Sequence, residues 1–106
     1  MKPQLFVLDS NGIVRKAQTT QEFLSFMGDT LEKVLITSRA YNICRVVTAF
    51  LGAEPPIAAH RRGGPRIFET RVYGGVVDGT VRYYDSQEKA MAGHKDILRL
   101  ITISIN

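Results

Sequence analysis

The chain contains no tryptophan, one cysteine and two histidines in 106 residues. A single cysteine excludes a disulfide within the chain and is typical of a protein in a reducing compartment. Cys44 has apolar neighbours in the sequence, and no adjacent group would activate its sulfur. We therefore expect a buried thiol and not a nucleophile.

Long apolar runs are also missing. No segment reaches the roughly 20 residues that a membrane-spanning helix needs. The apolar stretch near the N-terminus is interrupted at Asp9 and has no signal-peptide cleavage site, so it predicts a strand. The length and the 44% hydrophobic content are those of one ordinary globular domain, which we expect to comprise residues 1–106.

The sequence has none of the spacings HExxH, CxxC, GxSxG or the Walker pattern. His94 lies among apolar residues of an expected helix, which favours a packed histidine with one hydrogen bond over a catalytic base. His60 lies in a loop, and no cluster of histidine, cysteine and carboxylate suits a metal. We therefore expect no enzymatic activity, no metal and no cofactor.

The first half of the chain predicts a hairpin, a helix and two strands. Asn11-Gly12 between apolar runs is typical of a hairpin whose two central residues have positive φ. Thr19 and Glu22 have capping-box spacing at the start of a helix. β-Branched residues then favour strands at 33–39 and 43–51, with a continuous helix as the alternative.

The second half begins with a loop at 52–66, which holds three of the four prolines and is long enough to be functional. The alternating segment 67–73 and the segment 80–84 predict two strands joined by a glycine-rich turn. Asp85 or Ser86 caps a second helix. Residues 101–106 fit either an extension of that helix or a short strand.

These elements predict an α+β fold. The expected order is strand, strand, helix, four strands and a final helix, with an antiparallel sheet of about six short strands and both helices packed on one face. The segment 43–51 carries apolar residues on both sides, so we expect the second face to be buried against another copy of the chain. The prediction is a homodimer or higher homo-oligomer, with ligand sites at the subunit boundaries.

Basic residues outnumber acidic ones by fourteen to ten, and nine of the fourteen are arginine. Residues 39–71 hold six arginines but only two acids, Glu54 and Glu69. The planar guanidinium suits bidentate recognition of phosphate better than lysine does. A solvated basic surface is the alternative interpretation.

The loop "HRRGGPR", residues 60–66, is the strongest candidate for a phosphate site. Two adjacent glycines can turn successive amides toward an anion, and tyrosines nearby in the sequence offer rings on which a base could stack. The alternative is that the glycines only make a turn and the tyrosines belong to the core. The candidate ligand-binding residues are Arg61, Arg62, Gly63, Gly64, Arg66, Tyr73, Arg82 and Tyr83.

From Phe50 to Leu98 the sequence resembles a family of small proteins found in bacteriophage and prophage genomes. The family pattern reads FETxVxGG, then DG, then RY, then EAxxGH, and a T-V-F-L-G segment precedes it. The matching segments are residues 48–52, 67–75, 78–79, 82–83 and 88–94. Two departures are Ala53-Glu54 in place of an acidic–histidine pair, and Arg71 in place of an apolar methionine. No role of that pair is therefore carried over.

The group also resembles the sponge proteins that oppose Thoeris, a bacterial defence that signals through cyclic ADP-ribose isomers. This resemblance implies a phage protein in the host cytoplasm that sequesters a nucleotide-derived immune signal, either a cyclic ADP-ribose isomer or a cyclic oligonucleotide, without cleaving it. One alternative is an anti-CRISPR-like inhibitor that binds a host defence protein. Another is a small nucleic-acid-binding protein that uses the basic region 39–71.

Overall fold

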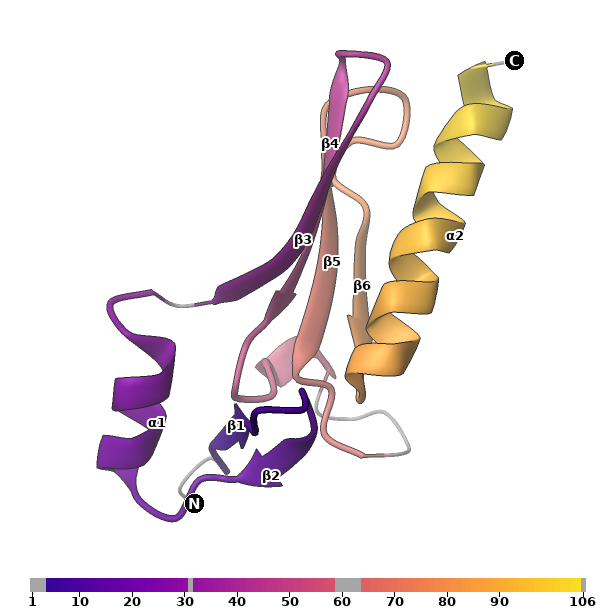
Figure 1. The fold of residues 1–106 in the computed structure, drawn as a ribbon. Coiled ribbons are helices and arrows are strands. Elements are labelled where there is room, and N and C mark those ends of the chain that lie inside the picture. Colours follow the sequence, from indigo (N-terminus) through magenta and orange to yellow (C-terminus); the bar gives the residue numbers. More distant parts are fainter. Residues whose placement is uncertain (1–3, 31, 59–63, 106) are drawn as a thin grey trace.

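The computed structural model describes residues 4–30, 32–58 and 64–105. These residues form two helices, six strands and one short 3₁₀ turn (Figure 1). In chain order they are β1 (Phe6–Leu8), β2 (Val14–Lys16), α1 (Thr20–Met27), β3 (Lys33–Ala40), β4 (Cys44–Phe50), η1 (Pro56–Ala58), β5 (Phe68–Tyr73), β6 (Val81–Tyr84) and α2 (Gln87–Ile105).

The α+β class and the order of the elements are confirmed, and the six strands are divided between two antiparallel sheets. β1 and β2 form a two-stranded sheet, and the larger sheet has the order β3-β4-β5-β6. α2 runs along one face of this sheet, and the small hairpin and α1 lie at its lower end (Figure 1). Of the two alternatives for residues 101–106, an extension of the helix or a short strand, the helix is correct as far as Ile105, where α2 ends.

The first hairpin is confirmed, but its turn differs from the expected one. Leu8 pairs with Val14, and of the two turn residues only Gly12 has positive φ, at 77°. The Asp9 carboxylate accepts hydrogen bonds from the amides of Asn11 and Ile13, which holds a longer connection in place. The pair of positive φ angles occurs instead in the β3–β4 turn, at Tyr41 and Asn42.

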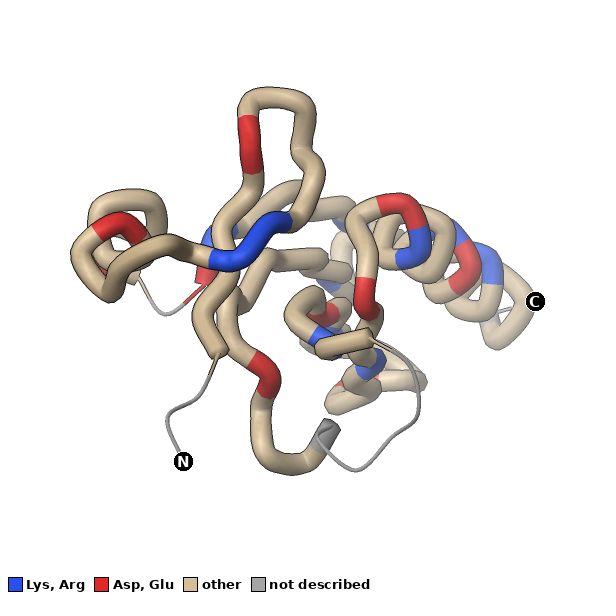
Figure 2. Tube along the Cα trace, turned by 90° about the horizontal axis from the view of Figure 1, so that it is seen from below, with Lys and Arg blue, Asp and Glu red and all other residues tan. Residues whose placement is uncertain are grey.

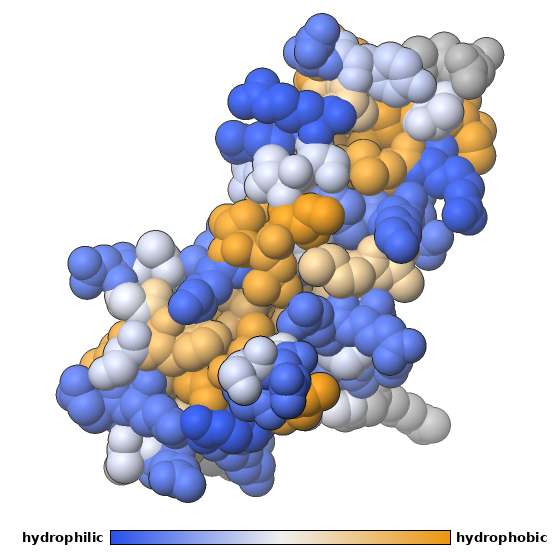
Figure 3. Space-filling view, in the orientation of Figure 1, coloured by the Kyte–Doolittle hydropathy of each residue, from blue (hydrophilic) through white to orange (hydrophobic). Residues whose placement is uncertain are grey.

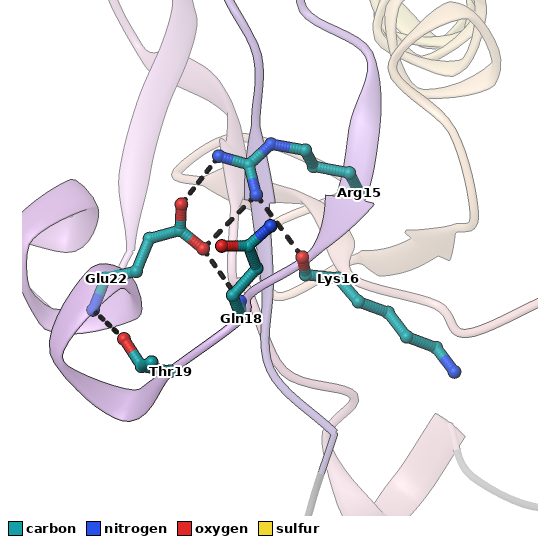
Figure 4. A network of polar contacts seen from close by, with 5 residues as sticks. All are labelled: Arg15, Lys16, Gln18, Thr19 and Glu22. Atoms are coloured by element: carbon teal, nitrogen blue, oxygen red, sulfur yellow. Dashed lines mark hydrogen bonds and ion pairs between the residues drawn. The ribbon is translucent and has the colours of Figure 1, made fainter.

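The start of α1 follows half of the expected capping box. The Thr19 hydroxyl accepts a hydrogen bond from the Glu22 amide at 3.0 Å. The Glu22 carboxylate, however, accepts from the Gln18 amide at 2.8 Å and from Arg15 at 2.7 Å (Figure 4). The hydrogen bond from Arg15, followed by that from Gln18, lowers the pKa of Glu22. This carboxylate therefore ties the start of α1 to β2.

Two apolar clusters lie between the larger sheet and the helices. The lower cluster joins the two sheets, and the Phe50 ring makes edge contacts with Phe26 and Phe68. The upper cluster packs the C-terminal half of α2 on β4 and β5, and Cys44 is buried there as expected. Both helices contribute to this side of the sheet, since α1 supplies Met27 and α2 supplies Ala90 to the lower cluster.

A chain of buried and half-buried polar side chains separates the two clusters. His94 of α2 bonds to Ser38 through Nε2 at 2.9 Å and to Thr48 through Nδ1 at 2.7 Å. Thr48 bonds in turn to Thr70 at 2.6 Å, and Thr70 bonds to the Tyr84 hydroxyl. These five residues, called the polar chain below, join α2 to all four strands of the larger sheet.

His94 is a packed residue, as the sequence predicted, although it makes two hydrogen bonds where one was expected. Its side chain is 2% exposed, and burial lowers its pKa. A neutral imidazole donates from one nitrogen and accepts at the other, so it can bond both hydroxyls without placing a charge in the core. The histidine therefore acts as an uncharged link.

This link makes stability depend on pH. Because the pKa of His94 is lower in the folded protein than in the unfolded chain, the unfolded chain binds more protons as the pH falls. We expect the stability due to neutral His94 to be complete above pH 6.5 and to decrease below it. Denaturant unfolding from pH 8 to pH 5 measures the change.

His94→Gln keeps a donor and an acceptor at this position but cannot titrate. It should show a smaller loss of unfolding free energy over the same pH range. An NMR titration of the wild-type imidazole supplies an independent readout. Equal pH dependence in both proteins, together with an ordinary pKa for His94, would contradict the uncharged link.

Candidate functional site

The face of the larger sheet opposite α2, called the outer face, carries a concentration of arginine and tyrosine. Strand register places directly paired residues on the same face. Burial decreases along it from Glu69, which is 8% exposed, to Tyr73, which is 42% exposed. Its cross-strand rows are Val34–Ala49–Glu69–Tyr83, Thr37–Val47–Arg71–Val81 and Arg39–Arg45–Tyr73.

A cavity of about 590 Å³ opens beside β5 and β6, and we call it the arginine cavity. This volume is within the roughly 300–1,000 Å³ range of small-molecule sites. One lining residue comes from η1 and one from the segment before β5, and the others come from the two strands. The lining residues are Ile57, Arg66, Arg71, Val81, Arg82 and Tyr83.

Arg71 is held in the cavity wall by a nearly buried carboxylate. Its Nε lies 3.2 Å from Oε1 of Glu69, and its Nη2 lies 3.3 Å from Oε2. The hydrogen bond with Glu69 is the largest cause of a raised pKa for Arg71. The bidentate pair fixes the guanidinium plane and compensates the buried carboxylate.

The other two arginines approach from different elements. The Arg66 amide donates to the Glu54 carboxylate at 2.7 Å, which fastens the end of the long loop just before β5. Arg82 lies on the outermost strand and is exposed; its Nη1 makes only a long 3.4 Å hydrogen bond to the Val81 carbonyl. Within the described residues Arg82 has no carboxylate partner.

The structure brings together three of the predicted site residues, Arg66, Arg82 and Tyr83. Arg61, Arg62 and Gly63 lie outside the described residues, as does His60. The sequence argument did not include Arg71 in the site. The alternation of Glu69 and Arg71 on one side of a strand was the signal that could have found it.

Gly64 does not line the arginine cavity. Its amide hydrogen-bonds to the Asp85 carboxylate, whose pKa is lowered first by Lys89 and also by this amide. An external anion would have to displace Asp85 in order to reach the Gly64 amide.

Tyr73 lies at the other end of the outer face, under the Arg45 guanidinium at 4.8 Å from the ring centre. This cation–π pair borders a smaller cavity of about 260 Å³. The Tyr73 row and the Tyr83 row are four residues apart along β5, so the two rings belong to separate parts of the face. The lining residues of the smaller cavity are Arg39, Asn42, Ile43, Cys44, Arg45 and Tyr73.

Several positions of the phage-family pattern have structural roles. Thr48, Thr70 and His94 belong to the polar chain. Asp78 accepts the Gly74 amide at 2.7 Å in the β5–β6 turn. A Cβ at Gly93 would collide with the Tyr84 ring and hydroxyl. These positions therefore maintain the sheet and the packing of α2.

Elsewhere, acidic and basic positions are interspersed along α2, so the helix presents no basic surface (Figure 2). In the described part of the chain, no three histidine, cysteine or acidic side chains form a group suited to a metal ion. The described helices include none with both the length and the apolar character for crossing a membrane.

Comparisons of the chain with protein-family models, with curated proteins and with solved structures found no match.

The Arg71–Glu69 pair can be tested by a double-mutant cycle. Arg71→Met leaves a nearly buried carboxylate without its partner, so we expect unfolding free energy to fall by about 1–3 kcal/mol. Adding Glu69→Gln should recover most of this loss. Chemical denaturation measures each variant.

Arg39→Met is the matched control, because Arg39 is an outer-face arginine with no ion pair among the described residues. We expect a change of less than about 0.5 kcal/mol. Similar effects of the two arginine substitutions, or no recovery in the double variant, would show that Glu69 does not depend on Arg71.

Proposed function

We propose that the protein binds a phosphorylated, nucleotide-derived ligand in the arginine cavity and sequesters it without cleaving it. The observation that carries this proposal is that Arg66, Arg71, Arg82 and Tyr83 all line one cavity of about 590 Å³. Guanidinium groups from separate elements suit an anion with several acceptor oxygens.

Some lining residues bind the ligand through charge and others through apolar contact. Arg82, which is exposed and has no described carboxylate partner, contacts a phosphate. Arg71, oriented by Glu69, supplies a second guanidinium in a fixed plane. Tyr83 offers its ring to a base, and Ile57 and Val81 cover apolar parts of the ligand.

The proposal includes no catalytic step. The described lining residues are three arginines, one tyrosine and two aliphatic residues, so none of them is a histidine, cysteine or carboxylate suited to proton transfer. Glu69, the carboxylate behind the wall, is engaged by Arg71. These features support a site that retains its ligand.

The biological setting of the proposal rests on the phage-family resemblance. In that setting the protein acts in the host cytoplasm against a defence that uses a nucleotide signal. The ligand is then a cyclic ADP-ribose isomer or a cyclic oligonucleotide, and sequestration prevents the signal from reaching its receptor.

The proposal also includes a homodimer, but through a different surface from the one expected. On β4 the outer-face residues are Arg45, Val47 and Ala49, of which Arg45 is exposed and Ala49 buried, so the centre of this face offers little apolar surface. β3 instead is an eight-residue edge strand on which Val34 is 55% exposed and Ile36 is 36% exposed.

Apolar side chains form a band across the middle of the molecule over β3 (Figure 3). An antiparallel strand can pair with a copy of itself about a two-fold axis, which satisfies its unpaired backbone groups and buries this band. Burial contributes roughly 25 cal/mol per Å² of apolar surface. Such pairing joins the two outer faces into one continuous surface at the subunit boundary.

Calorimetric titration with cyclic ADP-ribose isomers and cyclic oligonucleotides tests the ligand proposal. We expect micromolar or tighter binding, and recovery of the intact ligand after the protein is denatured. Arg82→Ala should weaken binding by roughly 10- to 100-fold, because it removes a hydrogen bond between charged groups.

Arg99→Ala is the matched control, since it removes the same charge from α2, away from the cavity. It should leave the affinity unchanged. Absence of binding across the panel, an altered ligand on recovery, or equal losses in both variants would overturn the proposed function.

Light scattering tests the dimer. We expect a mass of twice the 11.8 kDa of one chain at micromolar concentration. Ile36→Glu places like charges beside the two-fold axis and should give monomers, whereas Ile103→Glu, at an exposed position of α2, should not. A wild-type monomer, or a dimer insensitive to Ile36→Glu, would contradict pairing through β3.

A further inference from the structure

Three arginines cross the outer face in a diagonal, beginning at the wall of the arginine cavity. Arg71 lies on β5, Arg45 on the neighbouring β4, and Arg39 on β3. Arg45 pairs directly with both Arg39 and Tyr73, so the far end of the diagonal is one cross-strand row. Glu69 is the only acidic residue in the three rows of this face, and Arg71 already binds it.

The Arg39–Arg45 pair is unfavourable in the free protein. Like charges that are directly opposite each other on neighbouring strands destabilise a sheet. In the described part of the chain neither arginine forms an ion pair, and the Tyr73 ring under Arg45 is the only compensating contact that either guanidinium makes. An anion placed between the two guanidinium groups would remove the repulsion.

The smaller cavity provides the place for such an anion. Its volume is about 260 Å³, and both arginines line it with Asn42 and Tyr73. The β3–β4 turn supports this end of the face, with φ angles of 56° and 59° at Tyr41 and Asn42. These features make a second basic and aromatic subsite on the same face as the arginine cavity.

Strand geometry gives the spacing between the subsites. The rows of Arg71 and Arg45 are two residues apart, which is about 7 Å along the strands, and neighbouring strands are about 4.8 Å apart. Tyr83 and Tyr73 belong to rows four residues apart, or about 13 Å. A ligand the size of one nucleotide fills one subsite, whereas a linear polyanion can reach both.

We infer that the outer face binds a short single-stranded oligonucleotide. One nucleotide occupies the arginine cavity beside Tyr83, the backbone follows Arg71, Arg45 and Arg39, and a second base contacts Tyr73. Arginines interleaved with exposed aromatic rings on an open sheet suit unpaired bases and a phosphate backbone. This inference rests on the phosphate-binding arginine cavity of the proposed function and extends its ligand class to a linear chain of nucleotides.

Fluorescence anisotropy with labelled oligo-dT of 2, 4, 8 and 12 nucleotides, beside calorimetry with dTMP, tests the inference. We expect affinity to rise with length until both subsites are filled and then to level off. A matched double-stranded DNA should bind less tightly than the single strand.

Arg39→Ala/Arg45→Ala should weaken oligonucleotide binding by at least about 10-fold and dTMP binding by a clearly smaller factor, because the arginine cavity still binds one nucleotide. The slope of log affinity against log salt should become shallower by about 1.4, since each lost phosphate contact accounts for about 0.7. Lys95→Ala/Arg99→Ala removes the same charge from α2 and should change neither quantity by more than a small amount. Melting curves show whether each variant is folded.

If Arg39→Ala/Arg45→Ala does not fold, Arg39→Gln/Arg45→Gln, which retains polar side chains at both positions, replaces it. Binding of dTMP or a cyclic nucleotide without tighter binding of oligo-dT overturns this inference and leaves the proposed function standing. Equal losses in the two double variants, or equal affinity for the duplex, also overturn it. Absence of binding to oligonucleotides, dTMP and the cyclic nucleotides overturns both proposals.

Discussion

The arrangement of the outer face depends on the hydrogen-bond chain beneath α2. The polar chain joins β6, β5 and β4 through Tyr84, Thr70 and Thr48, and His94 then links Thr48 to Ser38 of β3. Side chains alternate along a strand, so a one-residue slip of β4 or β5 would turn Thr48 or Thr70 outward and bring an arginine under the helix. The buried hydroxyls and the imidazole would then lose their partners, which makes the alternative register unfavourable. The buried chain thus keeps the arginines on the outside.

On the α2 side of the sheet the polar groups are hydrogen-bonded to one another, whereas the charges of the outer face are only partly compensated. Glu69 engages Arg71, while Arg39 and Arg45 have no carboxylate partner among the described residues. Like-charged groups held close together destabilise a free protein and favour association with an anion. The rigid inner face can support this arrangement because the polar chain and the two apolar clusters hold the strands.

Local patterns were sufficient to predict the fold class, both helix starts and the packed state of His94. They were not sufficient to predict the site, because the site depends on register. Arg66 and Arg82 are 16 positions apart in the sequence and meet only because β5 and β6 pair. Tyr73 and Tyr83 both flank the same turn in sequence, yet the pairing places them in different rows.

The Gly64 amide was expected to face a ligand, but the start of α2 brings Asp85 to it. The sequence did not predict the division into two sheets either. The small hairpin contacts the larger sheet through apolar side chains and not through paired strands, and the sequence pattern does not distinguish these two arrangements.

The central claim is that the outer face, and not the surface of α2, binds a nucleotide ligand. Backbone amide chemical shifts, followed by NMR during titration with cyclic ADP-ribose isomers and with a short oligo-dT, test it directly. The account predicts that the largest changes fall on β5 and β6 around Arg71 and Tyr83, while the His94 imidazole signals stay constant. Changes concentrated on α2, or an outer face that stays unperturbed while a ligand binds, would contradict it.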